Sequence, residues 1–167
     1  MGFVKKELSE FPYNAFDAIG KDWMLVTAEK NGAVNTMTAS WGGIGKLWNE
    51  PVAFVFIRPQ RFTYGFTEDA DRMTLSFFGG EHKNELSYLG TKSGRDEDKI
   101  TNVGFHVTFL EDAPAIEEAK CVLVCRKLYS DMLKKDCFID EKMLSHYPGE
   151  DFHRVYVVKI EAMFTKE

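Results

Sequence analysis

The sequence has few cysteines, few prolines and no long apolar run. Cys121 and Cys125 lie four positions apart in an apolar segment and Cys137 stands alone, so the three cysteines form neither a CxxC motif nor a metal-binding spacing. Free buried thiols in a reducing cytoplasm are therefore expected, rather than a disulfide framework. The longest near-continuous apolar run, residues 52–57, has the length of a strand and falls far short of the roughly 20 residues that span a membrane.

An excess of positive charge and a targeting segment are also missing. The chain carries 21 basic and 26 acidic residues, and this net charge of −5 argues against a protein that binds nucleic-acid backbones. The first six residues contain no hydrophobic signal core, and Lys6 stands where a myristoylation motif needs serine or threonine. We therefore expect a cytoplasmic protein with no nucleic-acid partner and no membrane partner.

Aromatic and apolar residues are abundant by contrast. The chain is 44% hydrophobic and contains 14 Phe, 6 Tyr and 3 Trp, a composition that excludes a disordered protein. A chain of 167 residues hides roughly 70% of its unfolded surface on folding, enough for one sizeable core. Because no linker, repeat or low-complexity tract interrupts it and its five prolines are scattered, a single domain over residues 1–167 is predicted.

Most segments have the pattern of β-strands. Residues 23–30 and 33–40 flank Asn31-Gly32, the strongest short signal for a hairpin. Residues 52–58 are mostly apolar, which predicts a central strand covered on both faces. Further strands are expected at residues 73–77, 105–109, 121–129 and 156–164. In the last of these, one face is expected to carry Tyr156, Val158, Ile160, Ala162 and Phe164.

The predicted helices are few and short. One covers residues 62–69, and a second covers residues 82–89 and ends at Gly90. A third begins near residues 94–97, with Ser93 as its N-cap and acidic residues in its first turn. Six or seven strands joined by short helical crossovers predict a mainly β (α+β) fold, built as a closed or nearly closed antiparallel barrel.

Residues 35–43 form the first motif that suits a ligand. Small hydroxyl side chains and free backbone amides at a strand edge could satisfy the carbonyls and ring nitrogens of a flat heteroaromatic molecule, and Trp41 could cover it. An ordinary strand that runs into a glycine loop explains the same residues. Because Gly42-Gly43-Ile44-Gly45 does not fit GxGxxG and no amphipathic helix follows, a Rossmann site is rejected.

Residues 58–64 form the second motif. Here an apolar strand ends in Arg58, Arg61 and Thr63, directly before a predicted helix start. Guanidinium groups, a hydroxyl and the free N–H groups of a helix N-terminus together suit a phosphate group. Alternatively, the arginines are solvated or paired with carboxylates such as Glu68 and Asp69.

Residues 91–99 form the third motif, in which Ser93 and Lys99 could close over a ligand; a solvated charged turn is the alternative. The four histidines share no metal-like spacing. His106 is expected on an outward strand position with a structural role. His153 precedes the last strand, where a surface position is expected and a position in a pocket is the alternative. No GxSxG motif or Cys–His arrangement is visible, so nothing indicates covalent hydrolysis.

Taken in this order, the motifs resemble those of the flavin reductase-like, FMN-binding split-barrel family, and within it the flavoredoxin-type branch. The resemblance covers residues 13–165 and rests on residues 35–42, 55–63, 75–78, 93–99 and 152–156. It implies a Greek-key split β-barrel with a few short peripheral helices. It also implies a homodimer with one FMN per subunit near the dimer interface.

The resemblance also assigns cofactor-binding residues by position. Residues of the first motif would line the flavin ring and ribityl chain: Asn35, Met37, Thr38, Ala39, Ser40 and Trp41. Arg58, Arg61 and Thr63 would hold the phosphate, and Ser76 and Phe77 would lie beneath the ring. Ser93 and Lys99 would close the site. The three cysteines match no family motif, which leaves a redox role for them open.

The function implied is an FMN-dependent oxidoreductase that takes reducing equivalents from NAD(P)H and passes them to an acceptor. The cofactor carries the chemistry, so no protein acid or base is required. Two alternatives stay open: a flavoredoxin-like electron carrier fed by a redox protein partner, and a non-catalytic flavin-binding module or a relative with another ligand.

Overall fold

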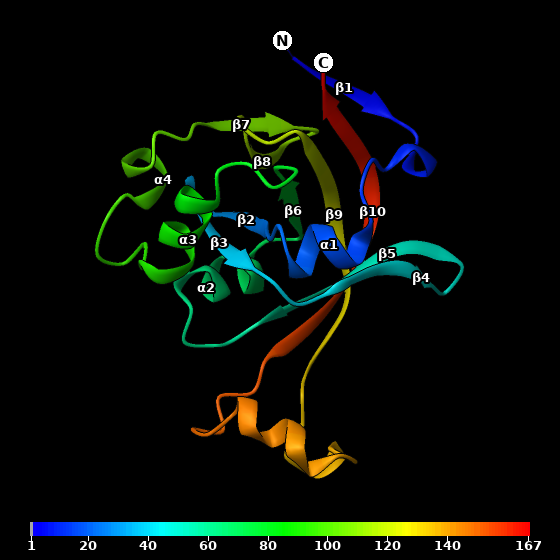
Figure 1. Cartoon of the computed structure of the whole chain (residues 1–167), viewed down its shortest axis with the longest axis vertical. Coiled ribbons are helices and arrows are strands. Elements are labelled where there is room, and N and C mark those ends of the chain that lie inside the picture. The colour runs from blue at the N-terminus through cyan, green and yellow to red at the C-terminus, as the bar shows by residue number, and fades with distance from the viewer. Residues whose placement is uncertain (1) are drawn as a thin grey trace.

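A computed structural model describes residues 2–167 (Figure 1). Its strands are β1 (Phe3–Lys6), β2 (Met24–Lys30), β3 (Ala33–Ala39), β4 (Gly43–Leu47), β5 (Glu50–Ile57), β6 (Arg72–Phe77), β7 (Val107–Leu110), β8 (Ala113–Ile116), β9 (Cys121–Met132) and β10 (Arg154–Lys166). The α-helices are α1 (Ala15–Gly20), α2 (Phe62–Asp69), α3 (Lys83–Thr91) and α4 (Lys99–Asn102). Short 3-10 helices are η1 (Leu8–Glu10), η2 (Lys135–Cys137) and η3 (Glu141–His146).

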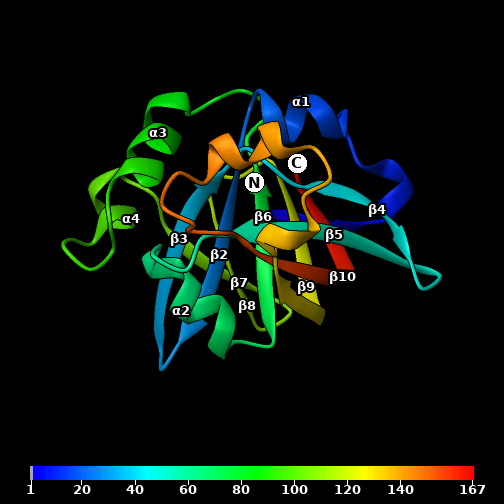
Figure 2. The same cartoon turned by 90° about the horizontal axis from the view of Figure 1, so that it is seen from below.

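Eight strands form one antiparallel sheet. Its order is β3-β2-β6-β9-β10-β5-β4, with β1 added to the far end of β10, while β7 and β8 pair separately. The two longest strands, β9 and β10, form the centre, and the β2–β3 and β4–β5 hairpins form the two wings. In Figures 1 and 2 the sheet is strongly twisted, with α2, α3 and α4 on the side of β2 and β3. A mainly β fold with short peripheral helices is thus confirmed.

The core lies on both faces of the sheet. One cluster is enclosed by the curved sheet with α1 and α2, and its members include Val26, Val55, Leu75 and Tyr156. A second cluster includes Leu25, Leu89 and Val122 and lies on the opposite face of β2 and β9, which α3 and β8 cover. Because strand residues alternate between faces, Leu25 and Val26 belong to different clusters. Both faces of β2 are therefore buried, and β2 provides a rigid support for its hairpin partner β3.

The local predictions that depend on turn chemistry are confirmed. Asn31 and Gly32 both have positive φ, 51° and 79°, as a two-residue hairpin turn requires, and Lys30 pairs with Ala33 across it. Helix α2 begins and ends at the predicted residues, 62 and 69.

Several predictions about the elements are wrong. The strands number ten in residues 2–167 rather than six or seven. The eight-stranded sheet has open edges, so a fully closed barrel, one of the two forms that the sequence allowed, is wrong. Helix α3 continues through Gly90 to Thr91. A Cβ atom at position 90 would lie 3.1 Å from the Cβ of Thr38, so this glycine serves the packing of α3 on β3 rather than ending the helix.

The helix predicted after Ser93 is also displaced. Residues 94–97 form turns, α4 begins at Lys99, and its N-cap is Asp98, whose side chain accepts from the Thr101 amide. In β10 the predicted alternation fails after Ile160. The pairing register with β9 shifts between Ile160 and Ala162, so Met163 enters the inner cluster and Phe164 packs in a different one.

Between β9 and β10 the chain makes a long excursion, residues 133–153, which we call the arm. It carries η2 and η3 and extends below the sheet in Figure 1. Its two ends are joined by a hydrogen bond from the Leu133 amide to the His153 carbonyl, 2.9 Å. The arm thus leaves and re-enters the sheet at one point.

Candidate functional site

A cavity of about 200 Å³ lies where the ends of β3 and β5, the start of α2 and the end of the arm meet. Its lining residues are Met37, Thr38, Ala39, Ser40, Trp41, Phe56, Arg58, Arg61 and His153. Seven of them, all except Phe56 and His153, are among the thirteen residues that the sequence motifs predicted. The structure therefore brings the first two motifs together, although 16 residues separate Trp41 from Arg58.

A tight crossing at Gly42 presents Ser40 and Trp41 to this cavity. Gly42 has φ of 145°, and a Cβ atom there would lie 2.7 Å from the carbonyl oxygen of Phe54. Only glycine fits this close approach between the start of β4 and the neighbouring strand β5. The crossing leaves the Trp41 side chain 47% exposed at the mouth of the cavity.

The polar side chains of β3 are mostly engaged in holding neighbouring helices. Thr38 donates its hydroxyl to the Leu86 carbonyl of α3 at 2.5 Å, and the buried Asn35 donates its amide to the Thr63 hydroxyl of α2 at 2.9 Å. Asn35 and Thr63 do not line the first cavity. Asn35 instead lines a neighbouring cavity of about 470 Å³ together with Gly94 and Lys99. These bonds fix the positions of α2 and α3 relative to the site.

Arg61 is a half-buried cation at the N-terminus of α2. It is the N-cap residue of this helix, and desolvation by burial lowers the pKa of its guanidinium group. Within residues 2–167, no carboxylate lies within ion-pair distance of Arg61, and the amides of Phe62 and Thr63 donate to no protein acceptor. These donors and the positive end of the helix dipole together favour an anion.

Lys99 adds a second cation next to Arg61. Its side chain is 2% exposed, and its ammonium group donates to the carbonyl oxygens of Leu89 at 2.9 Å and Lys92 at 3.1 Å. Burial, followed by repulsion from Arg61, lowers the Lys99 pKa to about 8, and Glu97 opposes the shift. Since an ammonium group has three protons, one remains for another acceptor. A buried amine that repels a neighbouring guanidinium is stabilised if an anion binds between them.

Arg58 has a different environment. Its guanidinium donates to Asp151 at 2.6 Å and to the His146 carbonyl at 2.9 Å, and it lies 4.9 Å from the centre of the Tyr147 ring. All three partners belong to the arm. A carboxylate pairing was one of the two alternatives for this arginine, but the partner is Asp151 rather than Glu68 or Asp69.

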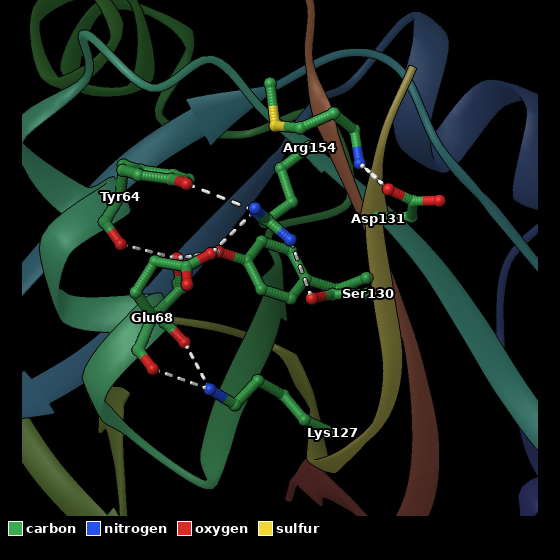
Figure 3. Close-up of polar contacts among 9 residues, drawn as sticks. Tyr64, Glu68, Lys127, Ser130, Asp131 and Arg154 are labelled. Carbon is green, nitrogen blue, oxygen red and sulfur yellow. Dashed lines mark hydrogen bonds and ion pairs between the residues drawn. The ribbon is translucent and has the colours of Figure 1, made fainter. Parts of the chain in front are cut away.

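Glu68 belongs to a separate polar network, shown in Figure 3. It accepts from Arg154 at 2.9 Å and from the Tyr156 hydroxyl at 2.6 Å, while Lys127 donates to the carbonyl of Glu68 at 2.9 Å. This network fastens the C-terminal half of α2 to β9 and β10. It therefore holds the helix whose other end carries Arg61.

The structure does not bring every predicted residue to the cavity. Ser76 and Phe77 lie on β6, which β2 separates from β3, and neither lines the cavity. The Ser76 hydroxyl is fully buried without a partner in the described chain, and Phe77 packs edge-on against Phe11 at 5.4 Å. Ser93 accepts from the Arg95 amide at 3.2 Å within the turn that precedes Lys99.

For His153 the expected surface position is wrong, and the alternative, a position in a pocket, is confirmed. Its side chain is 7% exposed and lines the cavity beside Trp41 and Phe56, with ring centres 5.4 and 6.3 Å away. Burial, followed by repulsion from Arg58, lowers its pKa to about 4 against the opposing effect of Asp151, so His153 is neutral at pH 7. Phe56 and His153 are the lining residues that sequence reasoning missed; their positions just before Arg58 and β10 gave the only signal.

His106 and the cysteines lie outside the site. His106 is exposed and pairs with Glu118 at 2.7 Å. Cys121 and Cys125 are buried, which raises the pKa of both thiols, that of Cys121 to about 12, so neither forms an appreciable amount of thiolate near neutral pH. Across residues 2–167, no group of His, Cys, Asp and Glu side chains is arranged to hold a metal ion. No helix in this range is long and apolar enough to cross a membrane.

Solved structures of similar fold include the FMN-binding domain of a flavin reductases-like enzyme from Shewanella baltica OS155, with a TM-score of 0.70, 17% identity, and 98% of this chain and 77% of that chain covered. The flavoredoxin of Desulfovibrio vulgaris gives a TM-score of 0.69 at 21% identity, covering 98% and 78% of the two chains. An FMN-binding protein from Thermus thermophilus gives a TM-score of 0.68 at 23% identity, covering 98% of this chain and 80% of that chain.

At these identities the structural matches establish the fold, which is that of the predicted split barrel. A search of curated proteins finds no match to the chain. The model of one protein family, described as the flavin reductase like domain, matches residues 16–167. With the family model covering nearly the whole chain and the fold in agreement, the chain belongs to the flavin reductase like domain family.

Proposed function

We propose that this protein binds FMN and acts as an NAD(P)H-dependent oxidoreductase that passes electrons from FMN to an acceptor. The observation that carries the proposal is Arg61, the N-cap of α2, which has no carboxylate partner among residues 2–167 and lines a cavity with aromatic walls. The buried Lys99 of α4 adds positive charge from the neighbouring cavity. A phosphate group attached to a flat ring system matches both parts of this site.

The residues present fit the cofactor. Arg61, Lys99 and the free amides of Phe62 and Thr63 supply the charge-assisted donors that a phosphate requires. Trp41 and Phe56 supply apolar surface for a flat ring. Relatives of the same fold are described as FMN-binding, which supports the same assignment.

Bound FMN would supply the two-electron transfer, with a reduced nicotinamide as donor. The protein's own residues bind and orient. Arg61 and Lys99 would bind the phosphate, and His153, which is buried and neutral, would offer the ring system a hydrogen bond without adding a charge. The arm covers one side of the cavity through the contact of His146 with Trp41, ring centres 5.2 Å apart, and limits the access of water.

We also propose that the protein works as a homodimer. On the face of the sheet opposite the inner core, Phe54 of β5, Val157 of β10 and Tyr129 of β9 lie in register across three strands. Tyr129 is 50% exposed and contacts Trp48, which is 58% exposed, at a ring-centre distance of 6.2 Å. Val157 is already buried at 6% exposed, so Tyr129 and Trp48 supply the exposed apolar surface that favours burial against a second copy. Light scattering after size exclusion tests it: a monomer that persists at high protein concentration contradicts the dimer.

The first experiment on function is the visible spectrum of the purified protein incubated with FMN, recorded before and after anaerobic addition of NADH or NADPH. Flavin bands that shift on binding and bleach with either nucleotide support the reductase. Bound flavin that both nucleotides leave unbleached would show that the donor is a different molecule, such as a redox protein. A protein that takes up no FMN contradicts the proposal as a whole.

A further inference from the structure

The arm contributes a buried hydrogen-bonded pair to the candidate site. The hydroxyl oxygen of Tyr147 lies 2.6 Å from Nδ1 of His153, and the two side chains are 8% and 7% exposed. Tyr147 is held in place by its own surroundings: its ring packs on Phe152 at 4.9 Å and on Phe138 at 6.0 Å, and Arg58 covers it at 4.9 Å.

The direction of this hydrogen bond follows from counting protons. A tyrosine hydroxyl has one proton, and among residues 2–167 the Tyr147 hydroxyl has no other acceptor than His153 Nδ1. If Nδ1 carried the proton and donated it, the buried Tyr147 proton would be left without an acceptor, which costs free energy. Tyr147 therefore donates, and Nδ1 accepts.

A neutral imidazole that accepts at Nδ1 carries its own proton on Nε2. His153 Nε2 has no partner in the described chain. The fully buried polar atoms without a partner are Ser76 Oγ, Asp151 Oδ1 and Glu161 Oε1. His153 Nε2 is not among them, so this nitrogen is not fully buried. Because His153 lines the cavity and Tyr147 does not, Nε2 is the ring nitrogen left for a ligand.

We propose that Tyr147 is a positioning residue, which holds His153 as the Nε2–H tautomer so that the cavity receives a neutral hydrogen-bond donor. The donor selects a ring that presents an acceptor atom, a carbonyl oxygen or an unprotonated ring nitrogen, between Trp41 and Phe56. The identity of that ring rests on the proposed function, whereas the tautomer does not.

The groups around the pair agree with this assignment. Arg58 faces Tyr147 and repels a proton on the imidazole. Asp151 accepts from Arg58 at 2.6 Å and from Gln60 at 2.7 Å, both at Oδ2, and its buried Oδ1 accepts from no group in residues 2–167, His153 included. No carboxylate in residues 2–167 accepts from His153, so the only group that selects between its two nitrogens is the Tyr147 hydroxyl.

Long-range ¹H–¹⁵N spectra of the ligand-free protein test the proposal directly, with the His153 signals assigned by their absence in His153→Gln. The wild type should show the Nε2–H tautomer alone, and Tyr147→Phe should shift His153 toward Nδ1–H or a mixture. Tyr13→Phe serves as the matched control, because the Tyr13 hydroxyl makes no hydrogen bond within residues 2–167 and Tyr13 does not line the cavity; it should leave the tautomer unchanged. An Nδ1–H tautomer in the wild type overturns the proposal, even if Tyr147→Phe does not fold.

FMN titration then tests the effect on a ligand. Tyr147→Phe should weaken FMN binding by about two- to tenfold, as expected for one neutral hydrogen bond. In a His153→Gln background, where the amide supplies its own donor, Tyr147→Phe should have no further effect. If Tyr147→Phe weakens FMN affinity by the same factor in the His153→Gln background as in the wild type, Tyr147 does not act through His153. If the protein binds no FMN, the proposed function fails, and the tautomer measurement still decides the role of Tyr147.

Discussion

Arg58 and Arg61 lie three positions apart in one motif, and their environments are opposite. Arg58 is neutralised by Asp151 and bound to the His146 carbonyl, so its charge holds the arm. Arg61 has no carboxylate partner in the described chain, is partly desolvated, and repels the buried Lys99. The charge of Arg61 is therefore available to a ligand, whereas the charge of Arg58 stabilises the position of the arm.

The difference shows that a motif's residue types do not settle which of its cations is available. A paired cation has already exchanged its hydration for a carboxylate, and an added anion would have to compete with that partner. An unpaired, half-buried cation gains more from a ligand's charge. Four experiments test this difference between paired and unpaired groups.

The largest effect is expected from Arg61→Ala. Loss of a charge-assisted hydrogen bond to phosphate, worth about 1.5–3 kcal/mol, should weaken FMN affinity by about ten- to a hundredfold. Titration by flavin fluorescence quenching measures it. Riboflavin, which lacks the phosphate, should bind wild type and variant equally; an unchanged FMN affinity in the variant would sink the phosphate assignment.

Lys99 should make FMN binding depend on alkaline pH. Its pKa in the free protein is lowered to about 8, so the ammonium form that a phosphate favours is lost as the pH rises above this value. FMN affinity should be nearly constant from pH 6 to 7.5 and fall by up to about tenfold per pH unit above pH 8. Lys99→Met should weaken binding at pH 7 and remove this dependence. A wild-type profile that is flat to pH 9.5 contradicts the role.

His153 should make the folded state less stable in acid. Because its folded pKa of about 4 lies below the ordinary 6.5, the unfolded chain binds the proton more readily between these values. The free energy of unfolding should therefore fall as the pH drops from 6.5 to 4, by up to about 3 kcal/mol from this group. Urea unfolding of wild type and His153→Gln isolates the contribution of His153, because the contributions of all other titrating groups cancel when the two free energies of unfolding are subtracted. Parallel pH profiles would contradict the burial of a neutral His153.

Arg58→Ala should have the smallest effect on FMN affinity, within about threefold, and a clear effect on the arm. Without the ion pair to Asp151, the arm loses its attachment to β5 and opens more often. Limited proteolysis should then cut within residues 133–153 faster than in the wild type, and Asp151→Asn should behave similarly. If Arg58→Ala weakens FMN binding as much as Arg61→Ala, the contrast between the two arginines is lost.

Features set by neighbouring residues could be predicted from the sequence. The Asn31-Gly32 turn fixes its hairpin through backbone conformations that those residues adopt at low cost, and the Arg58–Thr63 segment marks the start of α2 through its strand-to-helix change of pattern. The first two motifs are placed at one binding site by the resemblance to the family, and residues of both line one cavity.

Features that depend on distant partners could not be predicted. Asp151 meets Arg58 across 93 residues of sequence, and nothing near Arg58 indicates it. The register shift in β10 is invisible in an apolar segment that fits either face, and Gly90 has the sequence appearance of a helix end although its role is contact with Thr38. His153 precedes a strand, where a surface position is the ordinary expectation, and only the arm's return path buries it.

The hydrogen bond between Leu133 and His153 has a consequence for how the protein can evolve. Since the arm's two ends are already neighbours in the sheet, inserting or deleting residues between them alters neither the register of β9 and β10 nor the core, and doubling a loop's length costs only about 0.6 kcal/mol. The arm is in effect an exchangeable module next to the cavity. Proteins with this barrel could acquire different partners for the same binding site by replacing this one segment, while the strands that build the site stay as they are.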